Sequence, residues 1–433
     1  MYDLCIIGFG ISGICCAKWA EKYKLKYIIL EKEKDLGGCW FTKALESSTL
    51  QSPKNFYQFP DYKMPQDYPT FPNKNQILKY LKEYVRISNI KNINYNYNVL
   101  NLEYDNFWKI FVKKKNKQIK IKSRYIAICS GIYGEPNIID LKNRNNFLGQ
   151  IIHSKDLNTI KSEELKNKHI TLIGNGASCM DILKYISDLS TNINVIYRKN
   201  KWYVLDSILG IYTYFYINRI TVQMWNKLPH IFFIIFIGYV IKYLFLSPFE
   251  IPNKIFDHSN IIMCNKKIYN LVSLNFIKFV KDEPNYLYKN YLVLKTNKLI
   301  YSDIIILCTG YSTNISFLKS NINQNNYLHI INPQQNKCGF IGFTPSYNWV
   351  QVSYLQSRWF INYILGNIKL PEKKIMEYKI NQVLNKKRKL NIPYNDLTYD
   401  CFKYCDNIQN ELMIYTNKYT LSYWFQNPDY CMN

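Results

Sequence analysis

The chain opens on alternating blocks of apolar and glycine-rich sequence. Residues 4–7 are wholly apolar, residues 8–13 contain three glycines, and residues 14–23 mix apolar and polar positions as a helix does. A second apolar run, residues 27–30, ends on Glu31. This order predicts a buried strand, a tight turn, a helix and a second strand, which together form the βαβ unit of an α/β fold.

The turn has the spacing of a dinucleotide-binding motif, G-x-G-x-x-G. The first glycine makes the tight turn, the second lets the backbone approach a pyrophosphate, and the third lets helix and strand pack closely. Glu31 is spaced to accept hydrogen bonds from a ribose diol, which a fortuitous glycine turn would not explain. The candidate binding residues of this motif are Gly8, Phe9, Gly10, Ile11, Ser12, Gly13 and Glu31.

The same pattern recurs in the middle of the chain. Residues 169–173 form a predicted strand, residues 180–189 a helix, and residues 193–197 a further strand that ends on Arg198 and Lys199. Basic residues at that strand end favour the 2′-phosphate of NADP over NAD, and a solvated basic turn is the alternative. The candidate residues of the turn are Gly174, Asn175, Gly176, Ala177 and Ser178, with Cys179 at the place of the third glycine.

Two dinucleotide units on one chain predict two cofactors, FAD on the first and NADPH on the second, with hydride passing between them. Two further apolar runs, residues 125–131 and 303–311, end in small-residue turns. Such turns allow close approach of the backbone to a cofactor, so Thr309 and Gly310 are candidate contacts.

The order of these motifs predicts two Rossmann-like domains. Residues 1–150 and 311–433 form a discontinuous FAD domain that ends in C-terminal helices. Residues 151–310 form an inserted NADPH domain, which carries a helical, apolar insertion at about 203–256. The aromatic-rich residues 202–216 line a substrate channel in one interpretation and belong to the core in the other.

Composition narrows the class of partner. The formal charge is +25, but the basic residues are dispersed, with only short runs such as residues 113–115. This favours a solvated basic surface over a nucleic-acid site. The 12 cysteines contain no C-x-x-C pair, so neither a metal site nor a disulfide framework is expected, and reduced thiols fit a cytoplasmic protein. The N-terminus lacks the features of a signal peptide.

One segment leaves a membrane question open. Residues 231–241 carry no charge, and Lys242 separates them from the apolar residues 243–246. A spanning helix needs about 20 apolar residues, so a buried helix or a peripheral membrane contact through 231–246 is favoured over a span.

Further motifs carry a resemblance to a known family. The segment from Glu31 continues through G-G-C-W, and later segments read L-Q-S-P-K, F-P-D-Y, F-L-G-Q-I-I-H, C-T-G-Y and L-Q-S-R-W. In this combination and order the chain resembles the flavin-containing monooxygenase family, and more loosely its plant-like branch. The further candidate residues that the resemblance assigns are Lys32, Gly38, Cys39, Trp40 and Ser52 for the cofactor and Gln51 for both cofactor and catalytic centre.

The resemblance implies a reaction. NADPH reduces FAD, the reduced flavin takes up O2 as a C4a-hydroperoxide, and one oxygen is inserted into a soft nitrogen or sulfur nucleophile of a small molecule. The protein binds, orients and excludes side reactions. Trp40 lies beside the flavin in this interpretation and is a core aromatic in the alternative. Gln51 is a catalytic-centre amide or, in the alternative, a satisfied turn amide.

Two positions depart from the family pattern. Gln51 stands where many members have Asn, with the same amide on a longer arm as in the plant-like branch, and Leu157 stands where an aromatic is usual. Cys179 departs from the second glycine motif, where it replaces the third glycine. Leu157 followed by Asn158 also argues against the Baeyer–Villiger variant, which has Trp-Pro there. Weaker stabilisation of the oxygenated flavin would release H2O2, so an NADPH oxidase or flavoprotein reductase is the alternative function.

The residues favour two other functions less. A thioredoxin-reductase-like route needs a pair of nearby cysteines, and Cys179 is solitary in its motif. A non-catalytic membrane-associated binding protein would need a degraded first motif, which is intact. His153 is a general acid or base or, more favoured, a structural residue between domains, and residues 355–359 pack against FAD. The substrate, the choice of nitrogen or sulfur, and the oligomeric state are not specified.

Overall fold

The structure is a computed structural model that describes residues 1–190, 192–208, 211–213, 218–222, 247–250, 252, 261–318, 325–389, 392–397 and 401–413. Residues 231–246, the candidate membrane contact, lie outside the described residues. Across the part of the chain that is described, no helix is long and apolar enough to cross a membrane. The chain divides into two compact units, Met1–Thr42, Ser52–Gly134 and Thr313–Asn433 in the first and Lys43–Gln51 and Glu135–Ser312 in the second.

The first unit is built on a mixed sheet. Its apolar strand β1 lies between β2 and β6 and pairs with both in parallel, with Ile7 opposite Leu30 and Ile128. The first part of β6 turns back on β5 in an antiparallel meander, whereas its last part joins the parallel strands. The strands are β1 Tyr2–Ile7, β2 Tyr27–Leu30, β3 Ile93–Asn94, β4 Asn98–Asp105, β5 Phe107–Lys114, β6 Lys117–Ile128, β19 Ile331–Asn332 and β20 Gln335–Phe340.

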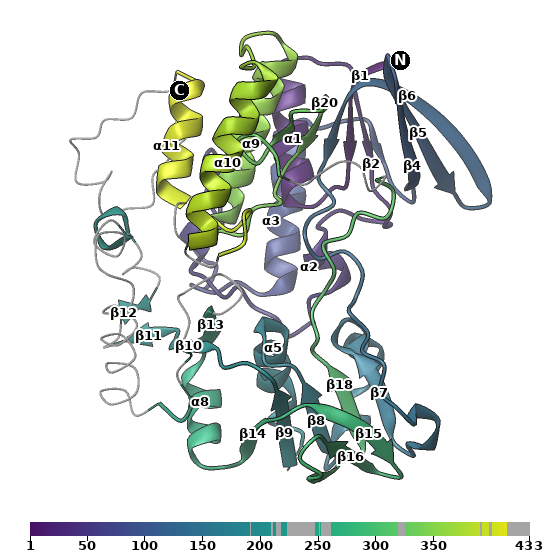
Figure 1. The fold of residues 1–433 in the computed structure, drawn as a ribbon, viewed down its shortest axis with the longest axis vertical. Helices are drawn as coiled ribbons and strands as arrows, with labels where there is room; N and C mark the ends of the chain where they lie inside the picture. The colour runs from purple at the N-terminus through teal and green to yellow at the C-terminus, as the bar shows by residue number, and fades with distance from the viewer. Residues whose placement is uncertain are drawn as a thin grey trace. The chain divides into compact units, whose positions relative to one another are not determined.

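Helices pack beside this sheet (Figure 1). The helix α1 follows β1 through the glycine turn, and α9 packs against it with a side that is buried along most of its length. A capping box at Asn73 and Gln76 begins α3 by satisfying free N–H groups of its first turn. The helices are α1 Ile11–Lys22, α2 Cys39–Thr42, α3 Lys74–Ile87, α9 Trp349–Ile364, α10 Lys373–Lys389 and α11 Cys401–Glu411.

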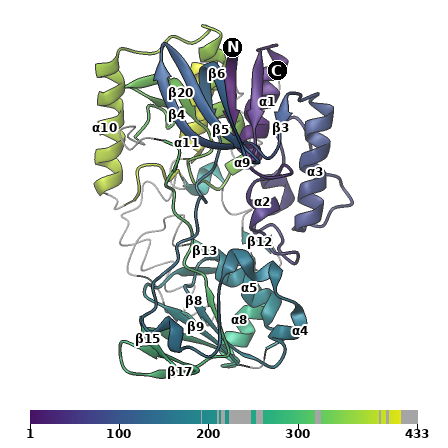
Figure 2. The same ribbon diagram turned by 90° about the vertical axis from the view of Figure 1, so that its right-hand side faces the viewer.

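The second unit contains a parallel sheet in the order β14-β9-β8-β18-β7 (Figure 1). Its strands β8 and β9 are also labelled in the turned view of Figure 2. Its central strands are apolar and buried, as expected where helices or loops cover a parallel sheet. The elements are β7 Gln150–His153, α4 Ser162–Leu165, β8 His169–Ile173, α5 Ala177–Ile186, β9 Asn192–Tyr197, β10 Trp202–Leu205, β11 Ser207–Ile208, β12 Ile211–Tyr212, β13 Ile261–Cys264, α8 Lys266–Ser273, β14 Ile277–Lys281, β15 Pro284–Tyr288, β16 Tyr291–Leu294, β17 Leu299–Tyr301 and β18 Ile304–Leu307.

The two units confirm the predicted α/β fold class with two Rossmann-like parts. Each contains a β-strand, a glycine turn, a helix and a parallel strand, and in each a second strand ends beside the turn. Those neighbouring strands are β6 and β18, the two apolar runs that end in small-residue turns.

Two details differ from the sequence expectation. The described residues at the start of the expected helical insertion form strands, because β10 pairs in parallel with β13. Trp202 and Tyr203 there are buried, and the Tyr203 ring stacks on Phe249 with centroids 4.0 Å apart, so these two aromatics belong to the core. The long segment of the compact second unit also begins at Glu135 rather than near residue 150, because bridges tie residues 136, 142 and 147 to residues 311, 286 and 289 of the same unit.

Candidate functional site

The first glycine turn leaves no room for a side chain at Gly8 or at Gly13. Gly8 has φ +98°, and a Cβ there would lie 2.8 Å from the carbonyl oxygen of Cys129 on the turn after β6. A Cβ on Gly13 would collide with the carbonyl oxygen of Gly8, so strand and helix pack as closely as the motif predicts. The turn therefore presents backbone N–H groups at the N-terminus of α1, which suits a pyrophosphate.

Glu31 lies at the end of β2 and is buried. Its carboxylate accepts the N–H of Phe9 at 2.6 Å and the N–H of Glu33 at 2.9 Å. Burial raises the pKa of Glu31, and these two hydrogen bonds and Lys32 oppose the rise. A carboxylate at this place beside a glycine turn fits the ribose of a dinucleotide, so the residues present fit the FAD that the sequence predicts.

The G-G-C-W segment packs on the same turn. Gly37 donates its N–H to the carbonyl of Phe9 at 3.1 Å, and a Cβ on Gly38 would lie 3.1 Å from the Cα of Gly10. The indole Nε1 of Trp40 donates to the hydroxyl of Tyr57 at 2.6 Å. The segment that contains Gly38 and Trp40 thus packs against the part of the glycine turn that contains Phe9 and Gly10.

Two further segments meet this turn, and neither Ser353 nor Gly342 was predicted from the sequence. The Ser12 hydroxyl lies 3.2 Å from the Ser353 hydroxyl on α9. A Cβ on Gly342, which has φ +76°, would collide with Ser12, and the Gly342 N–H donates to Oε1 of Gln356 at 2.9 Å. The short run F-I-G-F at 340–343 was the available signal. Gln356 belongs to the segment 355–359, which is buried in α9 except at half-buried Arg358.

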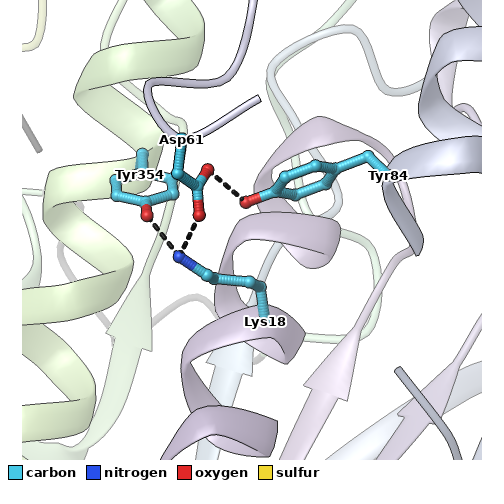
Figure 3. Close-up of polar contacts among 4 residues, drawn as sticks. All are labelled: Lys18, Asp61, Tyr84 and Tyr354. Atoms are coloured by element: carbon cyan, nitrogen blue, oxygen red, sulfur yellow. Dashed lines mark hydrogen bonds and ion pairs between the residues drawn. The ribbon is translucent and has the colours of Figure 1, made fainter. Parts of the chain in front are cut away.

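A polar cluster joins α1, α3, α9 and the F-P-D-Y segment of the first unit (Figure 3). The ammonium of Lys18 donates to the Asp61 carboxylate and to the Tyr354 hydroxyl, and the Tyr84 hydroxyl donates to Asp61 at 2.8 Å. Burial alone would raise the pKa of Asp61, but the hydrogen bonds of Lys18, Tyr84 and Tyr354 hold it below its usual value. We call these four residues the α1 cluster.

The second glycine turn repeats the geometry of the first. Gly174 has φ +106°, and a Cβ there would collide with the carbonyl oxygen of Cys308 after β18. Cys179, at the place of the third glycine, is fully buried in the core of the second unit. The side chain of Asn175 donates to the carbonyl of Lys199 at 3.0 Å and ties the turn to the end of β9.

Arg198 and Lys199 are exposed directly after β9. Neither takes part in an ion pair with any of the described residues. The nearby acid Glu250 accepts from Asn200 at 3.0 Å and pairs with Lys281 at 3.2 Å, so its charge is partly balanced. The strand end therefore offers cationic groups to a phosphate, which fits the 2′-phosphate of NADP.

Gln51 and Ser52 fall on either side of the division between the units. Ser52 is buried in the first, whereas Gln51 ends the segment Lys43–Gln51 of the second. The Nε2 of Gln51 donates to Oδ1 of Asp181 on α5 at 3.3 Å. Asp181 could not be predicted from local spacing, because its contact with Gln51 joins positions far apart in the chain. Thr309 and Gly310 lie on the turn after β18, where the Thr309 hydroxyl donates to the carbonyl of Asn137.

The departures at 157 and 158 have a packing explanation. Leu157 is buried in the core cluster that also contains Leu45. Asn158 donates to the carbonyl of Ala44 at 3.0 Å and accepts the N–H of Glu46 at 3.3 Å, so it fixes the backbone of the segment that ends at Gln51.

His153 lies at the end of β7 in the second unit and is buried. Its Nδ1 accepts the N–H of Lys155 at 3.2 Å, and its ring meets the Tyr311 ring edge-on with centroids 5.3 Å apart. Burial lowers the pKa of His153. No group of His, Cys, Asp and Glu suited to a metal occurs in the described ranges.

A chain with two Rossmann-like units, one ending its second strand on an acid and the other on basic residues, is an α/β oxidoreductase by class. A family model described as flavin-binding monooxygenase-like matches residues 2–433. The chain therefore belongs to this family, and it is a flavoprotein monooxygenase.

Individual relatives are distant. Flavin-containing monooxygenase 3 of Macaca mulatta is 24% identical over 468 residues, covering 95% of this chain and 83% of that protein. Probable indole-3-pyruvate monooxygenase YUCCA1 of Arabidopsis thaliana is 26% identical over 213 residues, 48% of this chain and 50% of the plant protein, so that match spans half its length. The crystal structure of OTEMO in complex with FAD and NADP has a TM-score of 0.67 at 15% identity, and each chain is covered to 84%. The last likeness is one of fold.

Proposed function

We propose that this protein uses NADPH and O2 to insert one oxygen atom into a soft nitrogen or sulfur nucleophile of a small molecule. The observation that carries the proposal is the pair of glycine turns with opposite ends. One turn lies beside the buried Glu31, and the other beside the exposed Arg198 and Lys199. This asymmetry suits FAD on the first turn and NADPH on the second.

The residues of each turn have distinct tasks in this proposal. In the first unit, the N–H groups of residues 8–13 bind the FAD pyrophosphate, Glu31 binds its ribose, and Trp40, with Gly38 and Cys39, lies beside the flavin. In the second, residues 174–178 bind NADPH, and Arg198 and Lys199 bind its 2′-phosphate. Bound FAD, once reduced by NADPH, would supply the means to activate O2 as oxygen donor, and the amide of Gln51 would contact the cofactor.

The domain assignment follows from the same tasks. The unit that contains Met1–Thr42 is the FAD domain, and the unit that contains Glu135–Ser312 is the NADPH domain. Lys32, Ser52, Thr309 and Gly310 complete the cofactor contacts of the proposal. A peripheral membrane contact through 231–246 stays a prediction.

Uncoupled NADPH oxidation is the second candidate function. It is favoured by Gln51, whose longer arm places the amide differently from the Asn of many family members, and by the buried Leu157 at the position of an aromatic. In this case reduced flavin returns its electrons to O2 and releases H2O2.

Product analysis tests the proposal. The purified protein with FAD is supplied with NADPH, O2 and either thioanisole, N,N-dimethylaniline or indole-3-pyruvate, the last chosen because of the plant relative's name. The proposal expects thioanisole sulfoxide or N,N-dimethylaniline N-oxide in proportion to the NADPH consumed. Equal amounts of H2O2 and NADPH turnover with no oxygenated product would favour the oxidase, and oxidation of indole-3-pyruvate alone would refute the soft-nucleophile class.

A further inference from the structure

Asp181 is an acid in direct contact with the candidate amide of the catalytic centre. It lies in the second turn of α5, the helix that begins at the second glycine turn, and its side chain is half-buried. The Nε2 of Gln51 donates to its Oδ1 at 3.3 Å.

We propose that Asp181 is a positioning residue that fixes which end of the Gln51 amide faces α5 and which end is offered to NADP(H). The inference rests on the proposed function, because it assigns a task to the contact between Gln51 and NADP(H). It adds a residue that touches neither cofactor and acts through a neighbouring side chain.

The chemistry of the two groups supports this selection. The Gln51 amide has a donor end, the NH2 group, and an acceptor end, the carbonyl oxygen. An ionised carboxylate only accepts, so Asp181 binds the donor end and turns Oε1 of Gln51 away from α5. Asparagine at 181 could donate as well as accept, and both orientations of the Gln51 amide would then be allowed.

The rest of the segment is fixed by other contacts. Leu45 lies in the core of the second unit, and Asn158 binds the backbone of Ala44 and Glu46. These contacts fix the backbone several residues before Gln51. Loss of the Asp181 contact should therefore release the Gln51 side chain without unfolding the segment.

The surroundings of the Asp181 carboxyl also support this role. Burial raises the pKa of Asp181, while Lys184 and the hydrogen bond from Gln51 oppose the rise. Acids whose pKa values are shifted by burial beside a specific polar partner are concentrated at functional sites. The proposal itself stands on the contact and its geometry.

The test compares Asp181→Asn, Gln51→Ala and the double variant in the FAD-bound protein. Two quantities are measured, the Kd of NADP+ by titration calorimetry and the H2O2 released per NADPH consumed. Asp181→Asn is expected to weaken NADP+ about tenfold, as loss of a charge-assisted hydrogen bond does, and to raise H2O2 release. The double variant is expected to lose nothing beyond Gln51→Ala, because Asp181 acts through that side chain.

Asp188 provides the matched control. It lies just after the same helix and is exposed in an ion pair with Lys267 at 2.5 Å. Asp188→Asn is expected to leave both quantities unchanged. Wild-type values for Asp181→Asn, or an equal loss from it in the presence and absence of Gln51, would overturn the proposal.

A folding failure would also be decisive. If Asp181→Asn does not accumulate as folded protein, Asp181→Ala takes its place, because alanine has the highest helix propensity. Loss of folding in both variants would assign Asp181 to stability and refute positioning. A wild-type protein that consumes no NADPH would refute the proposed function, whereas a coupled wild type with an unaffected Asp181→Asn would refute this inference alone.

Discussion

Glu31 accepts the backbone N–H of Phe9 in the glycine turn and that of Glu33 two residues later, so its carboxylate fixes the turn at Phe9. Arg198 and Lys199 differ, because they are exposed, and in the proposed function they bind NADPH through their charge. The end of β2 thus offers a carboxylate, whereas the end of β9 offers two cationic side chains. Substitutions at these positions should separate the binding of the two cofactors.

Glu31→Gln should weaken FAD binding. The substitution replaces one acceptor oxygen by an NH2 group, so one of the N–H groups of Phe9 and Glu33 then faces another donor. We expect the Kd of FAD to rise about tenfold, measured by titrating the apoprotein and following flavin fluorescence. Glu33→Gln is the control, since among the described residues the Glu33 side chain makes only a distant ion pair, with Lys32 at 3.9 Å. An unchanged Kd in Glu31→Gln would contradict the ribose assignment.

Arg198→Ala should reduce the preference for NADPH over NADH. Loss of a cation beside the 2′-phosphate weakens NADPH and leaves NADH nearly unchanged, because NADH has no such phosphate. We expect KM for NADPH to rise about tenfold, measured in steady-state kinetics with both nucleotides. Lys278→Ala, on the exposed part of β14, is a charge-matched control. Equal changes of KM for both nucleotides would argue for a general electrostatic effect.

At the scale of elements, the α1 cluster connects the helix after the first glycine turn to α3, α9 and the F-P-D-Y segment. The side chains of Lys18 and Asp61 are only 13% and 31% exposed, so each depends on its partner. Removing one member of such a pair leaves the other charge without compensation. The cluster therefore fixes how the F-P-D-Y segment packs on the dinucleotide helix.

Asp61→Asn should lower stability in a pH-dependent way. We expect a loss of about 1–3 kcal/mol in the free energy of unfolding at neutral pH, less than for a fully buried pair because the pair is partly exposed. The pKa of Asp61 is lowered from its ordinary 3.8. The stabilisation by its charge is thus present above pH 3.8 and is lost as the pH falls through the lowered folded-state pKa.

Urea unfolding of wild type and Asp61→Asn between pH 7 and pH 3 measures this effect. The control is Asp35→Asn, which removes the more exposed ion pair of Asp35 with Lys82. That variant should lose well under about 1 kcal/mol. A difference between wild type and Asp61→Asn that stays constant down to pH 3 would contradict the role of the charge.

Local patterns allowed much of each glycine turn to be predicted. In each unit the strand, turn, helix and next strand follow one another in the sequence. The spacing of apolar residues and glycines therefore predicts the segments from Gly8 to Glu31 and from Gly174 to Lys199. The contacts of Asp181, Asn158 and Ser353 were not accessible, since each joins segments that are distant in the chain. The strands β10, β11 and β12 were also missed, because they depend on pairing, of β10 with the distant β13 and of β11 with β12, and not on a local apolar period.

At the scale of the whole molecule, one chain contains two similar folding units, and the proposed function gives each unit a different cofactor. The membership of the flavin-binding monooxygenase-like family covers residues 2–433, so both units belong to the enzyme. In the proposed function each unit binds one cofactor, and the protein that carries both inserts oxygen into the substrate. Its central claim is that NADPH-reduced flavin transfers oxygen to substrate instead of releasing it as H2O2.

A stopped-flow experiment tests that claim most directly. The FAD-bound protein is reduced anaerobically with NADPH and then mixed with O2 in the absence of substrate, while the flavin spectrum is followed. The account predicts a persistent species that absorbs on the blue side of oxidised flavin and disappears faster when thioanisole or N,N-dimethylaniline is added. Direct return to oxidised flavin with one H2O2 per NADPH, unaffected by either compound, would contradict it.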